Sequence, residues 1–184
     1  MGASQTHSEH KYQDLVGKSG FSVEQIENLQ KRFQQLSGNE ETISRENLNS
    51  IPALANNPIK KQIIEAFFDK RNQHENEMGS FEEIGFEQFI MVMSHFRPPT
   101  LKTTEEEKQA MRKEKLRFLF NMHDTDSDGT ITLEEYRKAP DDVYEGITFE
   151  HFEQILKGLE MESRMHIRFL DVDTITMHCG KSTT

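Results

Sequence analysis

The chain has 184 residues, enough for one or two small domains with cores of their own. Its 32 acidic residues outnumber 22 basic ones, and the resulting net charge of −10 argues against nucleic acid as a direct partner. Such a chain fits a protein that recruits cations or binds basic helices. It contains no apolar run near the roughly 18 residues of a membrane span and no signal peptide. We therefore expect a cytosolic protein.

The composition favours helices. The chain contains 13 Phe and 9 Met but no Trp, and it lacks long alternating runs of β-branched residues. Methionine suits a surface that must accept a partner helix, although most of these side chains are expected to form ordinary core. The single cysteine, Cys179, excludes an internal disulfide and is compatible with a reducing compartment.

The first six residues match the pattern for N-myristoylation. Gly2 becomes the first residue once Met1 is removed, and Thr6 occupies the serine or threonine position of the pattern. A single myristoyl chain gives only reversible membrane binding, and no polybasic run lies nearby. If Gly2 is acylated, we expect the protein to visit membranes rather than reside there, unless a membrane partner holds it.

The first helix-loop-helix unit has the shape of an EF-hand without its ligands. Its helix opens at Ser22, where Gln25 completes a capping box. The loop that follows, residues 37–47, carries an apolar strand residue, Ile43. It is one residue short and has Asn47 in place of the final glutamate, so we expect no cation there.

The second unit repeats this pattern. A helix over residues 59–70 and a helix that begins at Phe86 flank a longer loop. Ile84 is the expected strand residue of that loop, and Gln88 stands where a carboxylate belongs. Two prolines within residues 97–100 then end the helix, which predicts a lobe boundary at this point.

Twelve residues in the second half of the chain, 124–135, have the spacing of an EF-hand calcium loop. A helix over 105–123, opened by a capping box at Thr104, leads into them. Such a loop offers Ca²⁺ about six to eight oxygens from alternate residues, and a glycine at its sixth position, here Gly129, permits the sharp turn. The expected ligands are Asp124, Asp126, Asp128, Thr130 and Glu135.

An acidic run of this kind can also be an ordinary solvated turn. Against that reading, Ile131 stands at the eighth position, where paired EF-hands place an apolar strand residue. Ca²⁺ is the cofactor that we expect. The same loop can admit Mg²⁺ if Glu135 binds through one oxygen only.

A fourth loop, residues 144–152, again lacks the ligands. Ile147 is its strand residue, but His151 stands at the glutamate position, and a neutral imidazole supplies no bidentate oxygens. The pattern from Thr148 to Leu159 predicts an amphipathic exit helix whose apolar face must be buried. The four units form an internal repeat, which predicts an all-α fold of EF-hand repeats in two lobes with one cation site.

The expected organisation divides the chain into four parts. A flexible segment with the myristoylation pattern is followed by a lobe of two ligand-free hands. The next lobe pairs the intact calcium loop with a truncated fourth hand, and a tail completes the chain. The corresponding ranges are 1–20, 21–97, 98–160 and 161–184.

Several segments together resemble the calcineurin B homologous proteins, a family of the EF-hand superfamily, over nearly the whole chain. They are Gly2-Ala3, RFQQLSG at 32–38, AFFD at 66–69, MSHFRP at 93–98, RKEKLRFLF at 112–120, the calcium loop and VYEGITFE at 143–150. The resemblance implies a regulatory protein with one functional cation site at the five ligands named above and with N-myristoylation at Gly2.

The same resemblance implies the partners and the location. It implies binding to the cytosolic juxtamembrane helix of plasma-membrane Na⁺/H⁺ exchangers, which supports their maturation and surface stability. It also implies inhibition of the phosphatase calcineurin, whose catalytic subunit is then a second partner. The expected location is the cytoplasm, with association with the plasma membrane and, in addition, the nucleus.

The chain departs from this family after the calcium loop. A complete hand continues with an exit helix and a linker, and a full entering helix precedes the next loop. Here Pro140 follows the loop closely, and the last loop is under way at Tyr144. We expect that a segment of roughly 30–40 residues, the size of such a helix pair, is missing relative to the family.

This departure predicts a weakened second lobe. Ile131 and Ile147 are still expected to pair as short strands, but two walls of the hydrophobic groove are lost. The apolar faces of residues 116–120 and of the helix after Thr148 are then expected to be exposed. We expect this lobe to be less stable than the first and to bind Ca²⁺ more weakly than a complete lobe.

Two other classes of function stay open at this point. One is a static Ca²⁺ or Mg²⁺ site, or a cation buffer, without a partner switch. The other is an enzyme, against which the sequence argues. It contains no Ser-His-Asp order, no phosphate-binding glycine loop and no zinc-type His/Cys cluster. We therefore predict a binding protein and not an enzyme.

Overall fold

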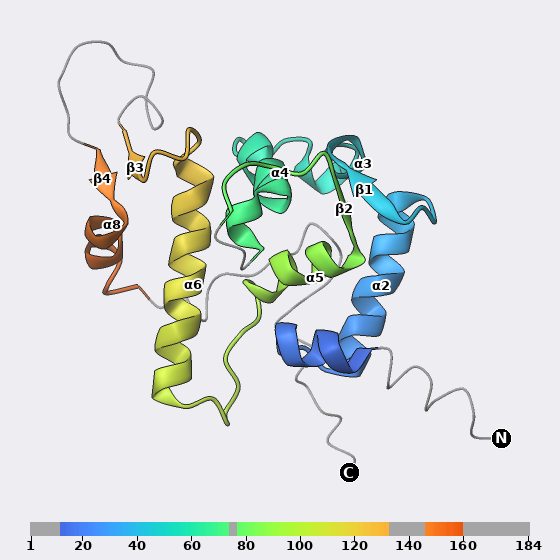
Figure 1. The fold of residues 1–184 in the computed structure, drawn as a ribbon, viewed down its shortest axis with the longest axis horizontal. Coiled ribbons are helices and arrows are strands. Elements are labelled where there is room, and N and C mark those ends of the chain that lie inside the picture. The colour runs from blue at the N-terminus through green and yellow to red at the C-terminus, as the bar shows by residue number, and fades with distance from the viewer. Residues whose placement is uncertain (1–11, 74–76, 133–145, 160–184) are drawn as a thin grey trace.

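The computed structural model describes residues 12–73, 77–132 and 146–159 of the chain. These residues are mostly helical, and their strands are short segments that pair the loops of neighbouring hands (Figure 1). The predicted all-α fold of EF-hand repeats is confirmed. Among the described helices, none combines the length and the apolar character that crossing a membrane requires.

The elements follow one another as helix, loop strand and helix. Residues 12–19 are helical. The α-helices that follow are α2 (Val23–Ser37), α3 (Arg45–Asn49), α4 (Lys60–Phe68), α5 (Phe86–Ser94), α6 (Glu105–His123) and α8 (Phe149–Ile155). Two 3₁₀ turns are η1 (Pro52–Leu54) and η2 (Lys70–Asn72). The strands are β1 (Thr42–Ser44), β2 (Glu83–Gly85), β3 (Thr130–Ile131) and β4 (Ile147–Thr148).

The strand residues pair as the sequence predicts. β1 and β2 are antiparallel, with Ile43 opposite Ile84. β3 and β4 are also antiparallel, with Ile131 opposite Ile147. Each pair joins two loops, because an isolated short strand would leave its backbone donors and acceptors unsatisfied. The fourth hand therefore keeps its pairing with the calcium loop despite its short connection.

The predicted capping boxes are present at two helix starts. The side chain of Ser22 accepts a hydrogen bond from the backbone N–H of Gln25, and the Gln25 side chain accepts one from the N–H of Ser22. Thr104 and Glu107 make the same reciprocal pair at the start of α6. These bonds satisfy N–H groups that have no partner within the helix.

The ligand-free loops use their last position as a helix cap. The side-chain oxygen of Asn47 accepts a hydrogen bond of 2.7 Å from the N–H of Ser44. Gln88 accepts one of 2.9 Å from the N–H of Gly85 in the same way. An amide at this position thus satisfies the first turn of α3 or α5. The hand keeps its shape although the glutamate is absent.

The larger core fills the space between the first two hands. Its centre is a group of aromatic rings, in which Phe89 lies 5.5 Å from Phe33 and 6.1 Å from Phe67 between centroids. α6 closes this core from one side, because Phe118 and Met122 are buried in it. Figure 1 shows α6 upright beside α4 and α5, with α8 on its other side.

A smaller core lies on the opposite face of α6. Four side chains form it, and Ile147, Phe152 and Leu156 cover them partly. The four are Leu116, Phe120, Ile131 and Phe149. The rings of Phe149 and Phe152 meet the ring of Phe120 edge-on, with centroids 5.6 and 5.7 Å away. α6 is therefore a helix with two apolar faces, one for each core.

The expected exposure of the second lobe is found only at Ile155, the last residue of α8, and at Leu159 after it. Leu116 and Phe120 are 0% and 1% exposed, so the prediction that residues 116–120 lose their cover is wrong. α8 packs directly against these two side chains and covers them, although the second lobe is expected to lack a helix pair. Ile155 and Leu159, by contrast, are 66% and 45% exposed and leave an apolar strip on the outside of the molecule.

Candidate metal centre

The calcium loop begins where α6 ends. The backbone N–H of Asp124 still donates to the carbonyl of Phe120, at 2.8 Å, so the last helical bond fixes the first ligand. The Asp124 side chain is 2% exposed, whereas Asp126 and Asp128 are open to solvent. One oxygen from each of these carboxylates lies within 4.8 Å of the others. The structure thus brings three of the predicted ligands together.

Hydrogen bonds within the loop hold these carboxylates in place. Asp124 accepts from the N–H of Asp128 through Oδ1, at 3.1 Å, and from the N–H of Gly129 through Oδ2, at 3.2 Å. Asp126 Oδ1 accepts from the Asp128 N–H at 3.2 Å. Asp128 Oδ1 accepts from both the N–H and the hydroxyl of Thr130, each at 2.8 Å.

The turn of the loop depends on left-handed backbone. Gly129 has a φ of +86°, which residues with a side chain rarely adopt. This is the glycine that the sequence assigns to the sharp turn, and the structure places it there. Thr130 follows as the first residue of β3, paired with Thr148.

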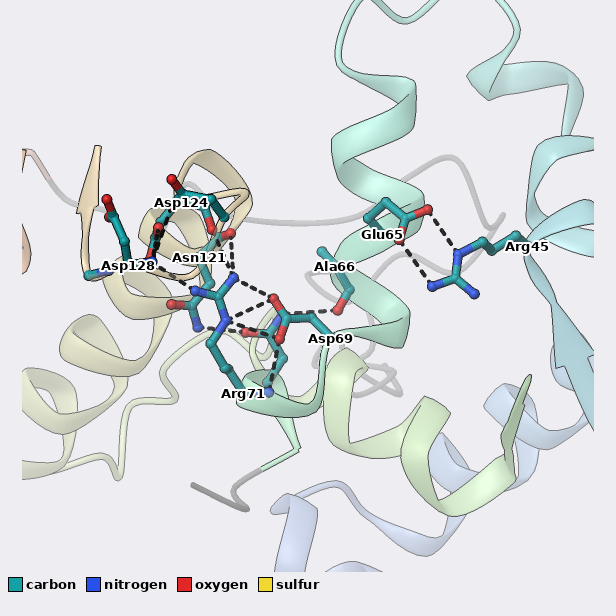
Figure 2. A network of polar contacts seen from close by, with 11 residues as sticks. Arg45, Glu65, Ala66, Asp69, Arg71, Asn121, Asp124 and Asp128 are labelled. Carbon is teal, nitrogen blue, oxygen red and sulfur yellow. Dashed lines mark hydrogen bonds and ion pairs between the residues drawn. The ribbon is translucent and has the colours of Figure 1, made fainter. Parts of the chain in front are cut away.

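An arginine from the first lobe reaches the first ligand. Arg71 of η2 donates through Nη1 to Asp124 Oδ2, at 3.0 Å. Its Nη2 donates to the carbonyl oxygens of Asn121 and Asp124, at 3.1 and 3.0 Å. Asp69 holds the other side of the guanidinium with contacts of 2.7 to 3.1 Å. Figure 2 shows Arg71 between Asp69 and Asp124.

Burial and hydrogen bonding move two carboxyl pKa values in opposite directions. Burial raises the pKa of Asp124, while the N–H of Gly129 and the charge of Arg71 oppose that rise. The hydroxyl and the N–H of Thr130 lower the pKa of the exposed Asp128. Burial thus disfavours the charged form of Asp124, whereas hydrogen bonds from Thr130 favour the charged form of Asp128.

The donor set fits a hard divalent cation. Carboxylate and carbonyl oxygens are the ligands that Ca²⁺ and Mg²⁺ prefer, and the described part of the loop offers three carboxylates and the backbone of Thr130. Asp124, Asp126, Asp128 and Thr130 would hold the ion, which would supply positive charge and no redox chemistry. Glu135 lies outside the described residues, as does Gly2, so both assignments stay predictions.

Comparison with known proteins gives the family. A model of the EF-hand domain matches residues 115–143, a range that includes the calcium loop. Calcineurin B homologous protein 3 of Homo sapiens is 44% identical to the chain, with 96% of this chain and 99% of the relative covered. The Xenopus laevis protein of that name is 46% identical, with 95% and 98% covered.

The chain belongs to the calcineurin B homologous protein family. The Gallus gallus member, also named calcineurin B homologous protein 3, is 42% identical over 90% of this chain and 94% of its own length. Together with the EF-hand match, this makes the chain an EF-hand calcium-binding regulatory protein. The resemblance that the sequence suggested is confirmed at the level of the family.

This calcineurin B homologous protein is shorter than the relatives to which it aligns. The alignment with the human protein extends over 213 positions, whereas the chain has 184 residues, so at least 29 positions have no counterpart here. A missing segment was expected after the calcium loop. Its location stays a prediction, because residues 133–145 lie outside the described part of the chain.

Sequence reasoning missed the residues that surround Asp124 from the first lobe. Arg71 and Asp69 follow α4 in a stretch without periodic pattern, and the bond from Arg71 to Asp124 spans 53 positions. Asn121 adds a buried bond of 3.1 Å to Asn72 of η2. The available signal was an arginine beside an aspartate at the end of a ligand-free hand, which is too common to indicate a site.

Proposed function

We propose that this protein is a calcium-binding regulatory adaptor that holds an amphipathic helix of a plasma-membrane Na⁺/H⁺ exchanger and promotes its maturation and surface stability. The observation that carries the proposal is an exposed apolar strip formed by Ile155, the last residue of α8, and Leu159, in the turn that follows it. It lies on the hand whose strand pairs with the calcium loop. An amphipathic helix binds such a strip through apolar residues three and four positions apart.

Charge supports the choice of partner. The chain has a net charge of −10, so a helix with basic residues on its polar face would be attracted to it. Nucleic acid would be repelled. The calcineurin catalytic subunit is a second proposed partner, whose phosphatase activity the protein would inhibit. We infer no catalytic activity for the chain itself.

The proposal is tested by pull-down with a peptide of the exchanger's juxtamembrane helix. Wild-type protein in Ca²⁺ is expected to retain the peptide, and the double variant Ile155→Ser and Leu159→Ser to retain it about tenfold less strongly, because two apolar contacts are lost. Glu135→Ala, which removes the expected bidentate ligand, is expected to reduce binding in Ca²⁺ to the level in chelator. The measurement is the dissociation constant of a labelled peptide.

Leu101→Ser is the matched control. Leu101 is fully exposed at 108%, but it precedes α6 in the chain and is not part of α8 or of the turn after it. It should leave peptide affinity unchanged. Equal affinity of the wild-type protein and the double variant would contradict the proposed surface. Equal affinity in Ca²⁺ and in chelator would instead contradict the proposed switch.

Acylation at Gly2 is proposed as the membrane signal, with the protein in the cytoplasm, at the plasma membrane and in the nucleus. A Gly2→Ala variant lacks the N-terminal glycine that the myristoylation pattern requires. It is expected to incorporate no labelled myristate and to move from the membrane to the soluble fraction. Ala3→Ser, which keeps Gly2, is the control. Labelling of the Gly2→Ala variant would refute the assignment.

A static cation site without a partner switch is the second candidate. The observation in its favour is the density of hydrogen bonds around Asp124, which also ties the loop to η2 through Arg71. A site held this firmly changes little when an ion enters. An apolar dye separates the two candidates, since only a switch changes dye binding on addition of Ca²⁺.

A further inference from the structure

Arg71 contacts one carboxylate oxygen of the first ligand, Asp124. Arg71 Nη1 and the N–H of Gly129 both donate to Asp124 Oδ2, at 3.0 and 3.2 Å. Oδ1 is the oxygen that accepts from the N–H of Asp128 inside the loop. The guanidinium therefore shares the Asp124 carboxylate with the backbone N–H groups of the loop.

The guanidinium is also fixed where it stands. Asp69 accepts from Nε and Nη2, and the carbonyls of Asn121 and Asp124 accept from Nη2. The Arg71 side chain is 17% exposed. An arginine with so many partners does not swing into solvent when an ion arrives, so its positive charge stays beside the loop in both states.

We propose that Arg71 sets the affinity of the calcium loop, as a built-in cation that shares the carboxylate of Asp124 and thereby weakens Ca²⁺ binding. The inference rests on the proposed Ca²⁺ binding of this loop. It adds that a residue of the first lobe regulates the affinity of that binding. In this role the first lobe, whose loops have Asn47 and Gln88 at the glutamate position, adjusts the calcium loop of the second.

Two physical effects give this sign. A fixed positive charge a few ångströms from a divalent ion repels it. In the cation-free protein, moreover, Arg71 is the counter-ion of the buried Asp124. Without Arg71, the cation-free protein would hold the buried negative charge of Asp124 without this counter-ion. Ca²⁺ would then neutralise that charge, so the free energy lost by the cation-free protein would be added to the free energy of Ca²⁺ binding.

A purely structural role for Arg71 predicts the opposite sign. If the arginine served only to orient Asp124, its removal would leave the ligand badly placed, and the affinity for Ca²⁺ would fall. The direction of the change in Kd therefore separates the two roles. A change in stability alone does not, because both roles predict some loss.

The test is calorimetric titration of the full chain with Ca²⁺. Arg71→Met is expected to bind Ca²⁺ about tenfold more tightly than the wild type, a change of about 1.4 kcal/mol. Arg71→Lys keeps the charge and is expected to stay close to the wild-type Kd. The gain in the Met variant should shrink as KCl is raised, because salt screens the charge that it removes.

Arg45→Met is the matched control, because it removes the same charge elsewhere. Arg45 pairs with Glu65 at 2.9 and 3.1 Å, away from the loop and next to α4 (Figure 2). It is expected to leave the Kd for Ca²⁺ within about twofold of the wild-type value, because surface charges at a distance are screened.

The outcomes separate this inference from the proposed function. An unchanged or weaker Kd in a folded Arg71→Met variant, with Ca²⁺ uptake by the wild type, overturns the inference alone. No uptake by the wild type overturns the proposed cation binding together with it. If the Met variant does not fold, Arg71→Gln, which retains hydrogen-bond donors without the charge, is measured with the same expected result.

Discussion

Asp124→Asn is expected to weaken Ca²⁺ binding by about two to three orders of magnitude, because affinity in such loops follows the number of charged ligands. The amide keeps the volume of the carboxylate but supplies only one oxygen. That oxygen must satisfy either the N–H groups that now donate to Asp124 or the ion. Arg71 also loses its partner at 3.0 Å. The measurement is calorimetric titration with Ca²⁺ in a buffer free of Mg²⁺.

Asp14→Asn provides the control for net charge. Asp14 is an exposed residue of the helical stretch 12–19, and its replacement changes the charge of the chain by the same amount. Its Kd for Ca²⁺ should match that of the wild type. A loss of less than about tenfold in Asp124→Asn would mean that the first position is not a ligand.

Phe89→Ala is expected to reduce the free energy of unfolding by about 3–5 kcal/mol. Phe89 is 0% exposed and packs between the rings of Phe33 and Phe67 at the centre of the larger core. Alanine would leave a cavity that helices α2, α4 and α5 cannot close, since each is tied to its neighbours by the strand pair or by short turns. Urea denaturation followed by far-ultraviolet circular dichroism measures the effect.

Leu101→Ala serves as the comparison for this variant. Leu101 is fully exposed, so its truncation removes no buried surface and should change the free energy of unfolding by less than about 0.5 kcal/mol. A loss below about 1 kcal/mol in Phe89→Ala would show that the core collapses around the smaller side chain. The packing described here would then not be the main support of the first lobe.

Local patterns in the sequence predict much of this fold. The pairs of Ile43 with Ile84 and of Ile131 with Ile147 follow from the apolar strand residue that each loop carries. The capping boxes follow from a hydroxyl residue and a glutamine or glutamate three positions later. The partners in a capping box lie three residues apart, and the partners in a strand pair occupy equivalent positions of the repeated hands. Both kinds of contact can therefore be recognised without the tertiary structure.

Contacts between lobes lie beyond such patterns. The two apolar faces of α6 are i and i+4 pairs on opposite sides, Leu116 with Phe120 and Phe118 with Met122. A sequence pattern indicates that these residues are apolar but does not indicate which partner each face meets. The prediction that residues 116–120 are exposed failed for this reason, because α8 still covers Leu116 and Phe120.

The last position of the ligand-free loops is a further limit. The sequence predicts that Asn47 and Gln88 are poor cation ligands, but it does not predict which groups these side chains contact instead. Their caps on α3 and α5 depend on the rotamer of a side-chain amide and on the N–H that it meets. The sequence is compatible with such a bond, and the structure shows it.

The position of α6 between two cores affects how the molecule unfolds. If the smaller core melted alone, α6 would remain held by Phe118 and Met122, and the strand of the calcium loop would lose its support on one side only. If α6 separated from the larger core, in contrast, both the smaller core and the calcium loop would lose the helix against which they pack. The calcium loop therefore depends for its folding on the first two hands. Heat should denature the two halves in a single cooperative transition whose midpoint is set mainly by the larger core.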